Sequence, residues 1–210
     1  MILEFRVLIA TYPEKLKTIY DSMDRAYEEA AAFYGFACRG CEDNCCTTYF
    51  FHYTVAEYLY LLQGFWALEE RTKKGIGERA MNMCDPSKRD NYLCPLNLCG
   101  RCLLYPYRTM ICRLHGLPFE VVRPNGQKDE GPGCPKFENE RTPAALPYRR
   151  IERTPFYTDL ANLEREIRAE VPALWRFKKT IAEMIRDAGK KESLPAVLKS
   201  LASQESFLSF

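Results

Sequence analysis

Apolar residues recur at three- and four-residue steps near the start of the chain, which is the spacing of a buried helix face. Thr11, Pro13 and Glu14 precede this series, and together they combine a capping threonine, an early proline and a capping-box glutamate. The series consists of Leu16, Ile19, Met23, Ala26, Ala30 and Phe33. Gly35 follows it, and glycine is common just after a helix. The pattern predicts a helix that begins after Thr11 and ends before Gly35.

A second capping box, Thr54 to Glu57, precedes an aromatic-rich series with the same spacing. The members of this series are Tyr58, Leu61, Leu62, Phe65 and Leu68. We expect a helix that begins after Thr54, stops near Gly75 and resumes as a short helix up to Met83.

The helical pattern is lost between Cys84 and Pro147, where proline, glycine and asparagine interrupt the sequence repeatedly. Such a segment reads as loops, with one hairpin predicted around Phe119–Val122 that turns at Asn125-Gly126. A long irregular segment is unusual inside a compact domain unless something else orders it. Bound metal would do so, because ligand bonds substitute for a packed core.

Helical spacing returns after Pro147. Leu160, Leu163, Ile167 and Val171 share one face, and Pro172 is expected to end that helix and start another. The next helix carries Leu174, Ile181 and Ile185 and ends at Gly189, and Ser193-Leu194-Pro195 opens a final short helix.

These patterns predict a mainly α fold, with a helical scaffold around an irregular, loop-rich centre and one short hairpin. We expect a single domain over residues 1–210. Within it, 1–83 holds N-terminal helices and the first cysteine cluster, 84–147 the irregular cysteine-rich segment, and 148–210 the C-terminal helices.

Charge and composition narrow the function. Thirty basic and 28 acidic side chains give a net charge of +2, which provides no basic face for nucleic acid. No stretch approaches the roughly 20 apolar residues of a membrane helix, and the first ten residues include Glu4 and Arg6, unlike a secretory signal. We therefore expect a cytoplasmic protein without nucleic-acid or membrane partners, in which ten cysteines are not a disulfide framework.

The ten cysteines are clustered. The first cluster, Cys38, Cys41, Cys45 and Cys46, has the spacing C-x2-C-x3-C-C, and a C-x2-C pair aims two thiolates at one zinc ion or iron–sulfur cluster. The neighbours Cys45 and Cys46 either reach one cluster through irregular backbone or face different partners. The remaining cysteines are Cys84, Cys94, Cys99, Cys102, Cys112 and Cys134. Their spacing Cys94-x4-Cys99-x2-Cys102 matches plant-type ferredoxins only numerically, without the surrounding glycines and serines of that fold.

The order of these motifs resembles the YkgJ-type cysteine-cluster family. The resemblance covers about residues 36–136 and adds Cys94-Pro95-Leu96, Cys102-x2-Tyr105 and Arg108-x3-Cys112-Arg113 to the first cluster. It implies a zinc- or iron-chelating domain. The matching ligands are Cys38, Cys41, Cys45, Cys46, Cys94, Cys102, Cys112 and Cys134. Thr109 stands where the family commonly has proline, and Cys84 and Cys99 are additional thiols, either of which would be able to replace a named ligand.

A more distant similarity to flagellin lysine N-methylases, in which a cluster is thought to take part in methyl transfer, admits an enzyme. The chain has no glycine-rich loop after a strand and no acidic ribose contact downstream, which a methyl-donor site would favour. We keep a cluster-dependent protein-modifying enzyme as one alternative and a zinc-stabilised interaction module as another.

Eight thiolates exceed the four that one structural zinc needs. They suit two zinc sites, one four-iron cluster with four thiolates left over, or two clusters, and the resemblance favours an iron–sulfur cluster (4Fe-4S) over zinc. Arg108, Arg113 and His115 are candidates for contacts to the sulfurs. The sequence thus favours a metal-binding protein with a redox, metal-delivery or cluster-dependent role, and a protein partner or protein substrate remains open.

Overall fold

The computed structural model describes residues 2–38, 45–140, 149–170 and 177–189. The chain forms two compact units that each combine separate stretches of sequence. Unit 1 consists of Met1–Cys45 and Thr109–Trp175, and unit 2 of Cys46–Arg108 and Arg176–Phe210. The prediction of one domain over the whole chain stays a prediction.

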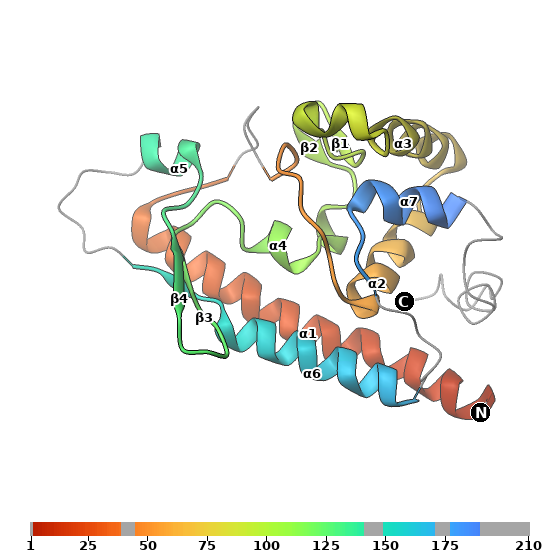
Figure 1. Ribbon diagram of the computed structural model, residues 1–210, viewed down its shortest axis with the longest axis horizontal. Helices are drawn as coiled ribbons and strands as arrows, with labels where there is room; N and C mark the ends of the chain where they lie inside the picture. Colours follow the sequence, from red (N-terminus) through yellow and green to blue (C-terminus); the bar gives the residue numbers. More distant parts are fainter. Residues whose placement is uncertain (1, 39–44, 141–148, 171–176, 190–210) are drawn as a thin grey trace. The chain divides into compact units, whose positions relative to one another are not determined.

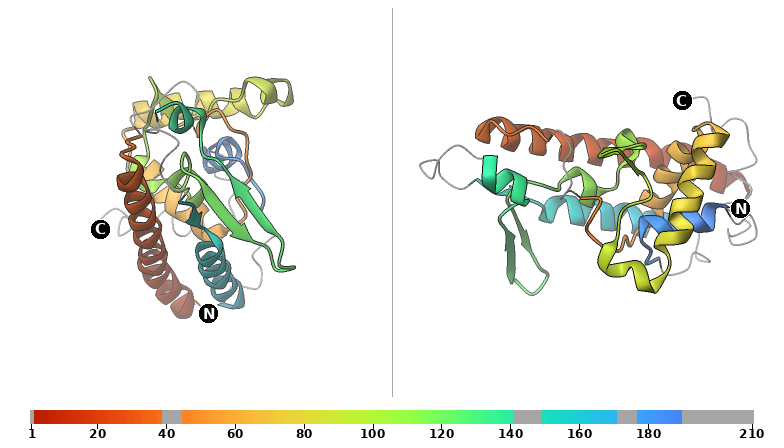
Figure 2. Two further views of the ribbon diagram at one scale, coloured as in Figure 1. Left: turned by 90° about the vertical axis from the view of Figure 1, so that its left-hand side faces the viewer. Right: turned by 90° about the horizontal axis from the view of Figure 1, so that it is seen from above.

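Two long helices form the body of unit 1. Helix α1 (Ile2–Tyr34) and helix α6 (Thr154–Glu170) run side by side, as Figures 1 and 2 both show. The buried residues of α1 recur at helical spacing: Tyr12, Leu16, Tyr20, Met23, Ala30 and Tyr34. The sequence pattern missed the three tyrosines among them. On α6 the buried residues include Leu160, Leu163 and Ile167, three of the four residues that the pattern predicted for this face.

Helix α1 begins at Ile2, so the predicted start after Thr11 is wrong. Pro13 lies inside the helix, where it removes one backbone hydrogen bond and costs about 3 kcal/mol. Tyr12 beside it is 1% exposed and Leu16 is fully buried, and this burial offsets the cost. The predicted end is confirmed, since Gly35 donates to the carbonyl of Ala32 at the last turn of α1.

A small sheet and two short helices complete unit 1. Strands β3 (Phe119–Val122) and β4 (Lys128–Gly131) form the predicted hairpin, which turns at Asn125-Gly126. Strand β5 (Ile151–Glu152) pairs in parallel with β3 and was not predicted. Helix α4 (Met110–Arg113) precedes the hairpin, and helix α5 (Pro135–Glu140) follows it.

The described part of unit 2 contains three α-helices. Helix α2 (Val55–Trp66) has the predicted capping box: the Thr54 hydroxyl accepts from the amide of Glu57 at 3.3 Å and donates to its carboxylate at 2.7 Å. Helix α3 (Glu70–Met83) packs against α7 (Ile181–Gly189). The predicted break near Gly75 is wrong, because the chain breaks after Trp66 and α3 continues through Gly75. Complete burial of Ile76 and Ala80 offsets the cost of glycine in α3.

The rest of unit 2 is short elements. Two 3₁₀ helices, η1 (Pro86–Asn91) and η2 (Tyr105–Tyr107), flank a small hairpin of β1 (Asn97–Leu98) and β2 (Arg101–Cys102). Helix α2 approaches η2 closely at Gly64, where an added Cβ would lie 2.3 Å from the ring of Tyr107. The β1–β2 hairpin was not predicted.

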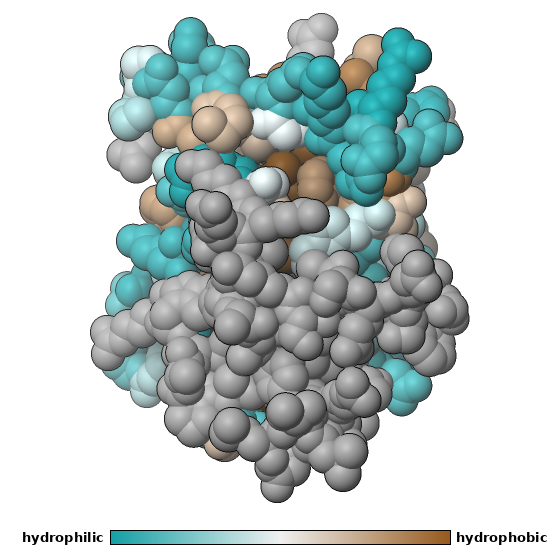
Figure 3. All heavy atoms as spheres, turned by 90° about the vertical axis from the view of Figure 1, so that its right-hand side faces the viewer, coloured by the Kyte–Doolittle hydropathy of each residue, from teal (hydrophilic) through white to brown (hydrophobic). Residues whose placement is uncertain are grey.

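Helices dominate the structure and the sheets have only two or three strands, so the mainly α prediction is confirmed. Val171, Leu174 and the helix predicted after Ser193 lie outside the described residues. Within the described ranges, no helix has the length and apolar character needed to cross a membrane. On the face drawn in Figure 3, hydrophilic residues cover most of the described surface, with apolar residues in a small area between them.

Candidate functional site

The candidate ligands are distributed over both units. Unit 1 contains Cys38, Cys45, Cys112 and Cys134, together with Cys41, which lies outside the described residues. Unit 2 contains Cys46, Cys94 and Cys102, together with the additional cysteines Cys84 and Cys99. No disulfide joins any of the nine described cysteines.

Cys134 is the most enclosed of the described thiols in unit 1, with 8% of its surface exposed. Its backbone amide donates to the carbonyl of Gly116 at 3.0 Å. Its sulfur accepts a hydrogen bond from the amide of Phe137 at 3.4 Å, at the start of α5. A neutral thiol is a weak acceptor, whereas a thiolate or a metal-bound sulfur attracts such donors strongly. The amide of Phe137 is therefore placed to donate to a metal-bound sulfur at this position.

Two glycines allow the backbone segments next to Cys134 to pack closely. An added Cβ at Gly133 would lie 2.8 Å from the carbonyl oxygen of Gly116 and 2.9 Å from the ring of Phe137. At Gly116, an added Cβ would lie 3.7 Å from the sulfur of Cys134 and 3.5 Å from the hydroxyl of Tyr27. The segments 116–117 and 133–134 therefore touch through their backbones.

Cys112 lies in α4 and also receives a hydrogen bond on its sulfur. The hydroxyl of Thr109, which is fully buried at the N-cap of α4, donates to this sulfur at 3.5 Å. Thr109 stands where the YkgJ-type pattern commonly has proline. Its hydroxyl is a hydrogen-bond donor, which proline lacks.

Cys38 follows the end of α1 and is exposed. The amide of Phe36 closes the helix end on the carbonyl of Ala31 at 2.9 Å. The ring of Phe36 packs edge-on against Phe137, with 5.5 Å between centroids, and Tyr34 packs on the same ring at 4.9 Å. These contacts bring the chain just before Cys38 to the helix that begins one residue after Cys134.

The arginines predicted to contact the sulfurs have other partners in the structure. Arg113 is buried, bonds Asp24 at 2.5 Å and lies 4.1 Å from the ring centre of Tyr20, both on α1. Arg108 donates to the carbonyl of Tyr105 at 2.9 Å and stacks on its ring. His115 is half-buried in the connection between α4 and β3. A role for these three residues toward the sulfurs stays a prediction.

Sequence reasoning missed Arg153, which lies in unit 1 directly before α6. It is 6% exposed, donates through Nη2 to the carbonyl of Leu114, and lies 3.8 Å from the ring centre of Phe119. Its Nε is buried without a hydrogen-bond partner. Burial lowers the pKa of Arg153 to about 10, while Tyr157 and Tyr27 act in the opposite direction. The sequence held no signal for this, because Arg153 is far from every cysteine along the chain.

In unit 2, backbone bonds connect the segments that carry Cys46, Cys94 and Cys102. The amide of Cys94 donates to the carbonyl of Cys46 at 2.7 Å, and the amide of Asn97 donates to the carbonyl of Cys94 at 2.9 Å. Asn97 is in turn the β-sheet partner of Cys102. The structure therefore gathers the three predicted cysteines of this unit into one local network.

Cys99 occupies the tip of the β1–β2 hairpin and is exposed. Cys99 and Gly100 both have positive φ, 51° and 80°, as in a two-residue type I′ turn. The amide of Gly100 donates to the side chain of Asn97 at 3.1 Å. Cys99 therefore occupies a turn position that usually holds asparagine, aspartate or glycine.

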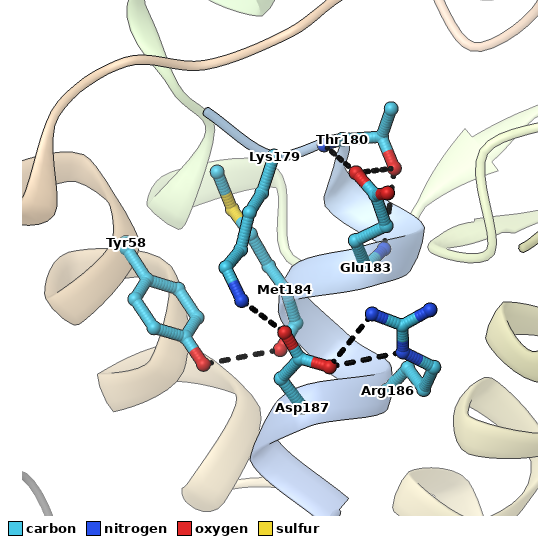
Figure 4. A network of polar contacts seen from close by, with 7 residues as sticks. All are labelled: Tyr58, Lys179, Thr180, Glu183, Met184, Arg186 and Asp187. Atoms are coloured by element: carbon cyan, nitrogen blue, oxygen red, sulfur yellow. Dashed lines mark hydrogen bonds and ion pairs between the residues drawn. The ribbon is translucent and has the colours of Figure 1, made fainter. Parts of the chain in front are cut away.

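Cys84 ends α3 and lies beside a polar network on α7, drawn in Figure 4. Burial raises the pKa of its thiol, and the adjacent Arg186 opposes that effect. Arg186 donates to Asp187 at 2.9 Å, and Lys179 bonds the same carboxylate. Burial raises the pKa of Asp187, but these hydrogen bonds outweigh it and leave the pKa below its ordinary value. Because burial raises the pKa of Cys84, the thiol at this position stays protonated at neutral pH.

His52 is a second buried polar group in unit 2. It is 2% exposed, its Nε2 has no hydrogen-bond partner, and its backbone exchanges two hydrogen bonds with Lys179. Burial lowers the pKa of His52 to about 4. The side chain is thus neutral at pH 7.

In the part of the chain that the structure describes, no three His, Cys, Asp or Glu side chains form a group that could hold a metal ion. Comparison with known protein families, curated proteins and solved structures found no match to this chain. The resemblance to the YkgJ-type family therefore stays a prediction.

Proposed function

We propose that this chain is a metal-binding protein whose cysteine thiolates hold an iron–sulfur cluster, with zinc as the alternative. The observation that carries the proposal is the hydrogen bond from the Phe137 amide to the buried sulfur of Cys134. Amide donors to sulfur stabilise the negative charge of metal thiolates and tune their potential.

The donor set fits such a metal by its chemistry. Thiolates are soft ligands that suit zinc and iron–sulfur clusters and disfavour magnesium or calcium. In unit 1 the proposed ligands are Cys38, Cys41, Cys45, Cys112 and Cys134, and in unit 2 they are Cys46, Cys94 and Cys102. When bound, a cluster supplies one-electron redox chemistry, whereas zinc supplies a structural link.

Neighbouring residues of the chain donate hydrogen bonds to two of the proposed ligand sulfurs. Phe137 and Thr109 donate to Cys134 and Cys112. The rings of Tyr34 and Phe36 each pack edge-on against the ring of Phe137, beside this segment. Cys134 has little solvent access. Its hydrogen bond from the Phe137 amide is strengthened by this, because an electrostatic interaction grows as the local dielectric constant falls.

Cysteine variants test this proposal directly. We expect Cys134→Ser and Cys112→Ser to lose bound metal, since each removes a thiolate that receives a hydrogen bond. Cys84→Ser is the matched control: Cys84 is also a partly buried thiol at a helix end, but its raised pKa makes it a poor ligand. Metal per chain, measured after anaerobic purification, should fall only in the first two variants. Full metal content in both would contradict the proposal.

A further inference from the structure

Arg153 is a buried cation whose charge has no carboxylate partner among the residues that the structure describes. Its described contacts are the carbonyl of Leu114 and the face of Phe119. Burying an unpaired charge costs several kcal/mol, so proteins bury arginine with a counter-charge. In the described part of the chain, the guanidinium of Arg153 therefore has no group of opposite charge beside it.

Two thiols of unit 1, those of Cys112 and Cys134, lie next to the segment that Arg153 contacts. Leu114, which accepts from Arg153, lies two residues after Cys112 and two residues before Gly116. Gly116 accepts the amide of Cys134, and the sulfur of Cys134 lies 3.7 Å from the Cβ position of that glycine. Tyr27, whose hydroxyl is 3.5 Å from the same position, also interacts electrostatically with Arg153. The guanidinium of Arg153 and the sulfur of Cys134 thus both lie against the short connection between α4 and β3, at Leu114 and Gly116.

We propose that Arg153 supplies the positive charge that balances metal-bound thiolates at Cys112 and Cys134. This inference rests on the proposed metal-binding function. A neutral thiol provides no counter-charge, but metal binding replaces thiols by thiolates and leaves an all-thiolate site negative. Arg153 then acts as a positioning residue: it orients the Leu114 carbonyl and lowers the cost of negative charge on sulfur. The charge is costly in the metal-free chain and favourable in the loaded chain.

The test compares Arg153→Met with wild type in two states of the full chain, stripped of metal and loaded with zinc as the probe. Methionine keeps a long apolar side chain and removes the charge. We expect the stripped variant to be at least as stable as stripped wild type, because an unpaired buried charge is gone. We expect zinc affinity, measured by competition with a chromophoric chelator, to fall about 10- to 100-fold. Arg153→Lys should recover part of that affinity, because it restores the charge.

Arg150→Met is the matched control. It removes the same charge three residues away, where Glu130 provides a counter-charge at 2.8 Å, and we expect unchanged zinc affinity. A purely structural Arg153 would instead give equal destabilisation of the stripped and loaded chains with unchanged affinity, which would overturn the inference. The same pattern would follow if Glu42 or Asp43, which lie outside the described residues, paired with Arg153. If wild type binds neither zinc nor iron, the proposed function itself fails, and this outcome is distinct from a variant without an effect.

Discussion

Burial of a single side chain controls the protonation of His52 in unit 2. The folded chain holds its pKa near 4, below the ordinary 6.5, because burial disfavours the charged ring. Between these two values the unfolded chain binds more protons than the folded chain, so stability must fall as the pH falls from about 6.5 toward 4.

The first prediction follows from this shift. For metal-stripped protein, we expect the free energy of unfolding to drop by about 2 kcal/mol between pH 7 and pH 5 on account of His52. His52→Leu removes the titrating group and should remove that part of the drop. Urea unfolding at both pH values measures it. An undiminished drop in His52→Leu would refute the assignment.

The local sequence identified some residues of the site but not others. The spacing of the cysteines indicates which thiols are candidate ligands. The sequence also shows that Thr109 replaces the proline of the YkgJ-type pattern, but only the fold shows its hydroxyl donating to Cys112. Arg153 was invisible, because its contacts to Leu114 and Phe119 depend on the pairing of β5 with β3.

Elements with strong local signals were predicted, and elements fixed by distant packing were not. The capping box at Thr54 and the turn at Asn125-Gly126 are local signals, and both appear as expected. Helix α1 runs through Pro13 and α3 through Gly75. In both cases burial against a partner helix overrides the preference of one residue, which no local pattern can indicate.

The close backbone contact that holds Cys134 provides the element-scale prediction. Gly133 has φ 106°, and an added Cβ would meet the backbone oxygen of Gly116 at 2.8 Å. We expect Gly133→Ala to destabilise the chain by roughly 2 to 5 kcal/mol, from strain at positive φ and from the clash. Thermal or urea unfolding measures this loss.

Gly126→Ala separates the two causes. Gly126 also has positive φ, 83°, but nothing lies within 4 Å of its Cβ position. Its replacement should cost only the strain, about 1 to 2 kcal/mol. Equal losses at the two glycines would show that the contact between segments 116–117 and 133–134 is not tight.

At the scale of the whole chain, the mainly α architecture was predictable, but its division into units was not. Each unit combines two separate stretches of the chain, and one of the boundaries between the units falls between Cys45 and Cys46. The sequence left open whether these neighbours share a partner, because adjacent side chains point in different directions. Cys46 joins the segment of Cys94 through a backbone bond within unit 2, whereas Cys45 belongs to unit 1.

The central claim is that cysteines hold a metal, and the most direct test is the metal content of the protein as purified. We would purify it without oxygen and measure its visible spectrum together with iron, zinc and sulfide per chain. The account predicts a brown protein with about four iron and four sulfide, or, for the zinc alternative, a colourless protein with about one or two zinc. A colourless protein that contains neither metal, and takes up neither when they are supplied, would contradict it.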